Sequence, residues 1–223
     1  MIEKYFQCGV RLKWNKPADG KFGNDGTMVN SAGVAAPMTY DGLDGQLQNP
    51  RFGTVNVSQL GFKMGMSIPY SWLDYAPGRT AKLAVAGNDV LTGYMSGCLL
   101  TRWQEGTTTY VAHVGTLDGD DYKPLNKTVK DNFMKQMPAD ITGFNPALAW
   151  DQAELRPLAL KKKPPPRFEV FGLLTTGGDF YAVALGILDI DPKTGKREWC
   201  VAGHKKVDAL DRAGLITAFN RIN

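Results

Sequence analysis

Hydrophobic and polar residues alternate in short runs along much of the chain, which is the period of β-strands. The pattern predicts strands at 53–57, 62–68, 81–85, 98–103 and 108–114, and a meander at 168–175, 180–190 and 197–202. Turn residues separate the strands of the meander, namely Gly177 and Gly178 in the first turn and the stretch DPKTGK in the second.

Two segments have helical spacing instead. Apolar side chains recur every four residues through 124–137, with lysines and Asp131 on the opposite face, and Pro138 ends the helix. A second helix is predicted over 207–219. The residues from 19 to 51 are rich in Gly, Asn and Asp and predict long loops with short strands, and the prolines of KKKPPP at 161–166 break regular structure. We therefore expect one α+β domain over 1–223, with mixed β-sheets forming a sandwich-like core flanked by helices and long loops.

Composition narrows the class of protein. Hydrophobic residues make up 43% of the chain and charged residues 22%, as in soluble globular proteins. The net charge of +4 comes largely from one short basic cluster beside prolines, so no nucleic-acid partner is expected. No apolar run is long enough to span a bilayer, and the N-terminal residues lack the pattern of a classical signal peptide. We expect a monomer that does not associate with membranes.

The three cysteines are widely spaced, which argues for reduced thiols and against a zinc site. Cys98 lies near the start of the segment SGCLLTRWQEGTTTYVAHVG. This segment predicts a β-hairpin with His113 near its other end. With Glu105 and Gly106 as the central turn residues, Cys98 lies directly opposite His113, and directly opposed Cβ atoms are about 4.5–5.5 Å apart. A thiol and an imidazole so placed can act as nucleophile and base. A different turn would shift the pairing, and an odd shift would separate the two side chains.

The same spacing is equally compatible with a structural pair, because cysteine and histidine also pack as ordinary core residues. A rival pair, Cys200 and His204, is expected to be divided between core and surface, since Ala202 and Gly203 suggest that the strand ends there. Cys8 has no histidine or acidic neighbour in sequence, and we assign it no role.

The segments TGYMSGC and YVAHVGT resemble the active-site segments of the cytotoxic necrotizing factors, Burkholderia lethal factor and the chemoreceptor glutamine deamidases. These proteins share a small-residue turn that ends in a nucleophilic Cys and a His on a following strand. Thr92 lies six residues before Cys98, where two of these branches have a Thr. The resemblance covers residues 92–116.

The resemblance implies a protein-glutamine deamidase in which Cys98 is the nucleophile, His113 the base and Thr92 the group that orients the imidazole. Ser96 and Gly97 belong to the active-site turn, whose backbone amides would stabilise an oxyanion. In the necrotizing factors a main-chain carbonyl orients the His, and the strand at 65–68 is a candidate source. No metal or organic cofactor is needed for this chemistry.

The implied substrates are host proteins, such as a Rho-type GTPase or a translation initiation helicase, or else a chemoreceptor. We expect a bacterial toxin or effector, made in the bacterial cytoplasm and delivered by a secretion system to the host cytosol. Two other classes stay open. One is a transglutaminase-like or other Cys–His hydrolase, and the other is a non-enzymatic binding or immunity protein in which Cys98 and His113 merely pack.

Overall fold

The computed structural model describes residues 2–8, 10–14, 28–29, 35–36, 52–58, 66–78, 80–117, 119–151, 154, 168–190, 192–193 and 197–221. The KKKPPP segment lies outside these residues, as does the predicted loop region at 19–51 except for two short strands. The helices of the described part are α1 (Lys123–Gln136), α3 (Arg212–Arg221) and the 3₁₀-helices η1 (Ile2–Tyr5), η3 (Asp120–Tyr122) and η4 (Pro146–Ala149). None of these helices is both long and apolar enough to cross a membrane.

Seven strands close into a barrel in the order β1-β13-β12-β11-β7-β5-β4. They are β1 (Arg11–Lys13), β4 (Phe52–Ser58), β5 (Met66–Leu73), β7 (Val90–Gly93), β11 (Phe168–Leu174), β12 (Phe180–Ile190) and β13 (Arg197–Val207). All neighbours in the barrel are antiparallel except β5 and β7, which run parallel.

A second sheet has the order β10-β8-β9-β6 and is antiparallel throughout. Its strands are β6 (Thr80–Ala84), β8 (Leu99–Glu105), β9 (Thr108–Val114) and β10 (Thr142–Phe144), and a separate pair joins β2 (Met28–Val29) to β3 (Ala35–Ala36). The predicted α+β class with sheets packed on each other is confirmed. Closure of one sheet into a barrel is a feature that the sequence did not predict.

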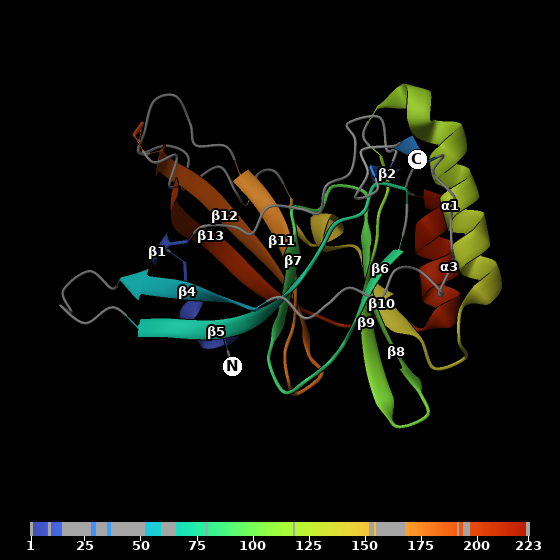
Figure 1. The fold of residues 1–223 in the computed structure, drawn as a ribbon, viewed down its shortest axis with the longest axis horizontal. Coiled ribbons are helices and arrows are strands. Elements are labelled where there is room, and N and C mark those ends of the chain that lie inside the picture. Colours follow the sequence, from blue (N-terminus) through green and yellow to red (C-terminus); the bar gives the residue numbers. More distant parts are fainter. Residues whose placement is uncertain are drawn as a thin grey trace.

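The core has three hydrophobic layers, which follow from the alternation of side chains along each strand. The barrel interior holds a cluster of aromatic side chains that includes Trp14, Tyr70, Trp72, Phe171 and Trp199. A middle layer lies between the barrel wall and the second sheet and includes Leu73, Met95, Cys98, Leu100, Val111, Phe144 and Ala182. The third layer lies between the second sheet and the two α-helices, which cover its outer face (Figure 1).

The turn of the β8–β9 hairpin lies one residue later in the chain than predicted, which shifts the pairing of the two strands by two residues. Its central turn residues are Gly106 and Thr107, and His113 pairs with Leu100 rather than with Cys98. Gly106 has φ of 60°, so the glycine takes the first turn position, where a positive φ is required. The shift between the two strands is even, and the side chains of Cys98 and His113 therefore still share a face.

An aromatic pair across the two strands favours the observed register. Trp103 pairs with Tyr110, and their rings stack with centroids 5.9 Å apart. The ammonium group of Lys82 lies 4.7 Å from the Tyr110 ring centroid and 3.6 Å from a carboxylate oxygen of Glu105. The Glu105 carboxylate also accepts a hydrogen bond from the Trp103 indole at 2.7 Å. The predicted register would have placed Trp103 opposite Thr108 and lost the aromatic pair.

Several further elements differ from the prediction. Strand β5 runs from Met66 to Leu73, whereas a strand was predicted at 62–68, and strands β7 and β10 were not predicted. Strand β13 does not end at Ala202 and Gly203 but continues to Val207, because a β-bulge against β12 absorbs the irregularity. His204 is therefore a half-buried strand residue opposite Val183 and not a loop residue. Helix α3 begins at Arg212 rather than at residue 207, since residues up to Val207 remain in the barrel.

Gly93, which ends β7, offers a test of the close packing between β7 and β11. It has φ of +144°, and a Cβ atom there would lie 2.6 Å from Phe171 Cδ1. Gly87 also has a positive φ, of +76°, but a Cβ atom there would meet nothing within 4 Å. Gly87→Ala should therefore cost only the backbone strain, about 1–2 kcal/mol of unfolding free energy. Gly93→Ala should cost roughly 1–3 kcal/mol more because Phe171 must move.

Urea unfolding of both variants and the wild type measures this difference. Equal losses of stability in the two variants would show that the contact with Phe171 does not restrict Gly93.

Candidate active site

Thr92 lies in the part of the barrel wall that faces the middle layer. It lies in β7, beside Leu73 of the parallel strand β5, and is completely buried. Its neighbour Leu91 packs inside the barrel, so the side chain of Thr92 points to the opposite face, into the middle layer. The Thr92 hydroxyl donates a hydrogen bond to the main-chain oxygen of Leu73 at 2.8 Å.

His113 meets this hydroxyl from the second sheet. Its Nδ1 atom lies 2.7 Å from Thr92 Oγ1, and its side chain is completely buried. A hydroxyl has one hydrogen, and that of Thr92 is already donated to Leu73. The imidazole must therefore donate Nδ1–H to Thr92, which leaves the lone pair on Nε2. The contact between Thr92 and His113 that the sequence predicts is present, and it favours the tautomer in which Nε2 carries no hydrogen.

Cys98 lies directly before β8 and packs in the same middle layer, with only 3% of its surface exposed. Its sulfur accepts a hydrogen bond from the main-chain N–H of Thr116 at 3.4 Å, and the Thr116 hydroxyl lies 3.6 Å away. Thr116 follows His113 by three residues, just beyond the end of β9. A main-chain N–H directed at the sulfur stabilises negative charge on it.

Tyr75 joins the two halves of the site. Its hydroxyl donates a hydrogen bond to the main-chain oxygen of Thr116 at 2.6 Å. Its ring packs against the imidazole of His113, with centroids 5.3 Å apart. The tyrosine thus holds the segment that contacts the Cys98 sulfur and also covers one side of the histidine.

The turn before Cys98 is anchored by Met95. Its side chain is buried in the middle layer, and its main-chain N–H donates to the Val170 oxygen of β11 at 2.8 Å. The next residue, Ser96, is exposed and Gly97 is half-buried, so the turn presents its backbone next to the cysteine. The two turn residues named by the sequence prediction lie beside Cys98 on the solvent side of Met95.

Sequence reasoning missed three groups of this site. The first is the main-chain carbonyl of Leu73, which lies outside the predicted 65–68 stretch. This carbonyl accepts a hydrogen bond from the Thr92 hydroxyl, and Thr92 in turn contacts the imidazole. Thr116 ends the segment that resembles the deamidases, but only the fold reveals its contact with sulfur. No local sequence pattern marks Tyr75, because it lies in the segment between β5 and β6, far from Cys98 and His113 in sequence.

The remaining chemistry-bearing residues lie elsewhere. Cys8 is exposed and Cys200 is half-buried on β13, and both are free thiols. His204 of the rival pair packs against Tyr181, with ring centroids 5.9 Å apart. Within the described ranges, no cluster of three or more His, Cys, Asp or Glu side chains could hold a metal ion.

Comparisons of the chain with protein-family models, with curated proteins and with solved structures found no match.

Thr92→Val tests the hydrogen-bond chain from Leu73 to His113. Valine keeps the shape but removes the hydrogen bonds of the hydroxyl to the Leu73 carbonyl and to His113 Nδ1, which should cost about 1–3 kcal/mol of unfolding free energy. Nitrogen NMR of the imidazole should show the Nδ1–H tautomer in the wild type and a mixture of tautomers in the variant.

Thr101→Val is the matched control. Thr101 is another fully buried strand threonine, and its hydroxyl has no hydrogen-bond partner among the described residues. Its replacement by valine should therefore leave stability unchanged or raise it. An equal loss of stability in the two variants, or an unchanged imidazole spectrum in Thr92→Val, would contradict the assigned hydrogen-bond chain.

Proposed function

We propose that this protein is a protein-glutamine deamidase that uses Cys98 as nucleophile, His113 as base and Thr92 as the residue that orients the base. The observation that carries the proposal is the Thr92 hydroxyl, which is fixed by Leu73 and holds His113 with Nε2 as the basic nitrogen. A Cys–His hydrolase needs such a third group to set the tautomer of its base. The resemblance of residues 92–116 to the deamidases supports the same assignment of roles.

The first half of the reaction transfers the glutamine side chain to the enzyme. His113 Nε2 takes the thiol proton, and the Cys98 thiolate attacks the carboxamide carbon, which forms a C–S bond and a tetrahedral oxyanion. Main-chain N–H groups of the Gly97–Cys98 turn would stabilise the oxyanion. The intermediate collapses as the C–N bond breaks, and His113 gives its proton to the departing ammonia.

The second half returns the enzyme to its starting state. His113 removes a proton from water, which attacks the thioester carbon, and the C–S bond breaks to release glutamate and the Cys98 thiolate. The proton on His113 then returns to the Cys98 sulfur, which restores the thiol and the neutral imidazole. Thr116 N–H, at 3.4 Å from the sulfur, stabilises this leaving thiolate. The net reaction is hydrolysis of a side-chain amide to a carboxylate and ammonia, and no cofactor enters it.

The approach route and the biological setting belong to the same proposal. Cys98 is buried, whereas Tyr94 and Ser96 of the preceding turn are exposed, so a substrate glutamine would enter over this turn. A flexible glutamine side chain on a host protein suits such a route. The resemblance favours an effector that acts on a Rho-type GTPase or a translation initiation helicase in the host cytosol after secretion.

Cys98→Ser should abolish deamidation while the protein stays folded, because a hydroxyl is a far weaker nucleophile with this base. Host-cell lysate treated with the wild type and the variant is compared by peptide mapping for glutamines converted to glutamate. Cys8→Ser, which changes an exposed cysteine, is the matched control and should retain wild-type activity. Deamidation by folded Cys98→Ser would refute the mechanism, and incorporation of an added primary amine in place of water would assign transglutamination instead.

Thr92→Val should lower turnover by roughly ten- to a thousandfold with little change in KM, since the residue acts on the base and not on the substrate. Thr101→Val again serves as control and should turn over normally. Wild-type turnover in Thr92→Val would remove Thr92 from the machinery while leaving Cys98 and His113 in it.

A further inference from the structure

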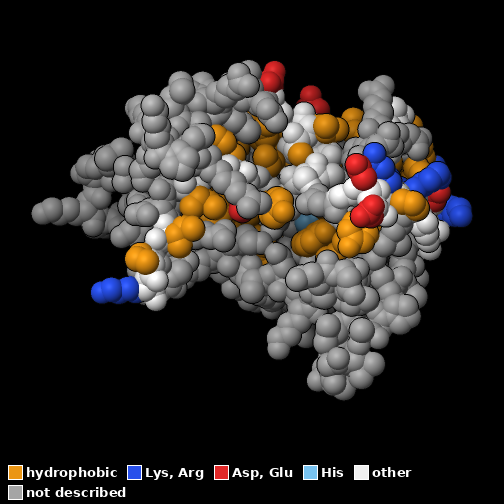
Figure 2. All heavy atoms as spheres, turned by 90° about the horizontal axis from the view of Figure 1, so that it is seen from above, with side chains coloured by type: hydrophobic (Ala, Val, Ile, Leu, Met, Phe, Trp, Pro, Cys, Tyr) orange, Lys and Arg blue, Asp and Glu red, His pale blue; other side chains and the backbone are white. Residues whose placement is uncertain are grey.

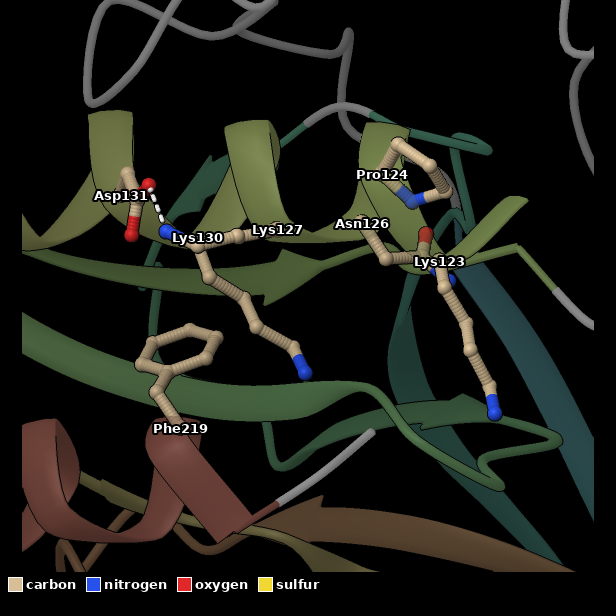
Figure 3. Close-up of a pocket in the computed structure, with 7 residues that line it drawn as sticks. All are labelled: Lys123, Pro124, Asn126, Lys127, Lys130, Asp131 and Phe219. Atoms are coloured by element: carbon tan, nitrogen blue, oxygen red, sulfur yellow. Dashed lines mark hydrogen bonds and ion pairs between the residues drawn. The ribbon is translucent and has the colours of Figure 1, made fainter. Parts of the chain in front are cut away.

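A pocket of about 440 Å³ lies beside α1 and α3, apart from the Cys98 and His113 side chains. The residues that line it are Lys123, Pro124, Asn126, Lys127, Lys130 and Asp131 of α1 and Phe219 of α3. In Figure 3 the side chains of Lys123 and Lys130 extend from α1 in the same direction, on the side from which Phe219 rises. The volume is that of a small-molecule site.

Lys130 is the unusual residue of this pocket. Only 8% of its surface is exposed, and no residue of the described ranges forms a hydrogen bond or an ion pair with its ammonium group. Lysine side chains are seldom buried to this degree, and the ammonium end of this one borders the pocket. Burial lowers the pKa of Lys130 below its ordinary value, because the charged form loses hydration. An anion bound in the pocket would supply the missing counter-charge.

The other two lysines of the pocket each have an aspartate nearby. Lys127 forms an ion pair with Asp131 at 2.6 Å, and Lys123 forms one with Asp120 at 3.1 Å. Both pairs are exposed, so each holds its lysine only weakly. The lining itself carries three lysines and one aspartate. Charged side chains also gather at the α1 end of the face seen in Figure 2.

The N-terminal end of α1 also borders the pocket. Lys123 and Pro124 form the first turn of the helix, and the N-cap residue Tyr122 makes no side-chain capping bond. The N-terminal end of a helix carries partial positive charge that favours anions. Phe219 and Pro124 add an apolar wall, so the pocket can also hold a carbon skeleton next to an anionic group.

We propose that the pocket between α1 and α3 binds a phosphomonoester, with the Lys130 ammonium as its central ligand and Lys123 and Lys127 around it. A phosphate dianion matches the excess of two positive charges in the lining, which has three lysines and one aspartate. The pocket contains none of the residues proposed for catalysis, so its ligand is independent of the deamidase proposal.

Calorimetric titration with phenyl phosphate tests the proposal, because this probe joins a phosphomonoester to an apolar ring. Lys130→Met should weaken binding by about ten- to a hundredfold, the effect expected when a charged hydrogen bond is lost. It should also raise the urea unfolding midpoint, since a buried charge is replaced by an apolar side chain of similar length. Lys135→Met, at an exposed position of the same helix, is the matched control and should bind the probe as the wild type does.

Sedimentation with phosphatidylcholine vesicles, with and without phosphatidic acid, distinguishes a lipid headgroup from a soluble ligand. Binding to either phosphomonoester that is lost in Lys130→Met and kept in Lys135→Met supports the proposal and names the source. No binding of either probe, or equal binding by Lys130→Met and the wild type, overturns it.

Discussion

The single hydrogen of the Thr92 hydroxyl determines the state of the whole candidate site. It is donated to the main-chain oxygen of Leu73, and for that reason the imidazole of His113 must donate its own Nδ1–H in return. The two hydrogen bonds also join the barrel to the second sheet, since Thr92 belongs to one and His113 to the other. One polar contact therefore sets the tautomer of the histidine and also links the two sheets across the middle layer.

The middle layer gives these groups an environment that solvent does not reach. Thr92 and His113 are completely buried, Cys98 is nearly so, and apolar side chains such as Met95 and Leu100 surround them. Hydrogen bonds are stronger in such surroundings, and the same surroundings penalise any buried polar group that lacks a partner. Thr116 meets this requirement for the Cys98 sulfur, and Tyr75 meets it for the Thr116 carbonyl, which is why the site extends beyond the three residues that the local motif indicates.

The helix at 124–137 and most of the strands were predictable because their periodicity is local, and β9 matches its predicted bounds at Thr108 and Val114. Strand β7, which carries Thr92, was not predicted, because its four residues are all buried and lack the alternation of a half-buried strand. The hairpin register was not, because it depends on the packing of Trp103 against Tyr110 and on the positive φ of Gly106. The barrel, the Leu73 carbonyl and the role of Tyr75 are likewise products of long-range pairing. The spacing of Thr92 and Cys98 indicated a site only because residues 92–116 resemble the deamidases.

The contact between Thr116 and Cys98 has a consequence for how variants of this hairpin would behave. His113 and Thr116 belong to one continuous stretch of chain, so the residues around the imidazole and the sulfur are fixed relative to each other over three positions. The turn at Gly106 lies at the far end of the hairpin, beyond the paired rings of Trp103 and Tyr110. A fluorescent label at the exposed position of Thr107, which keeps Gly106 and the turn length, would therefore leave the site intact.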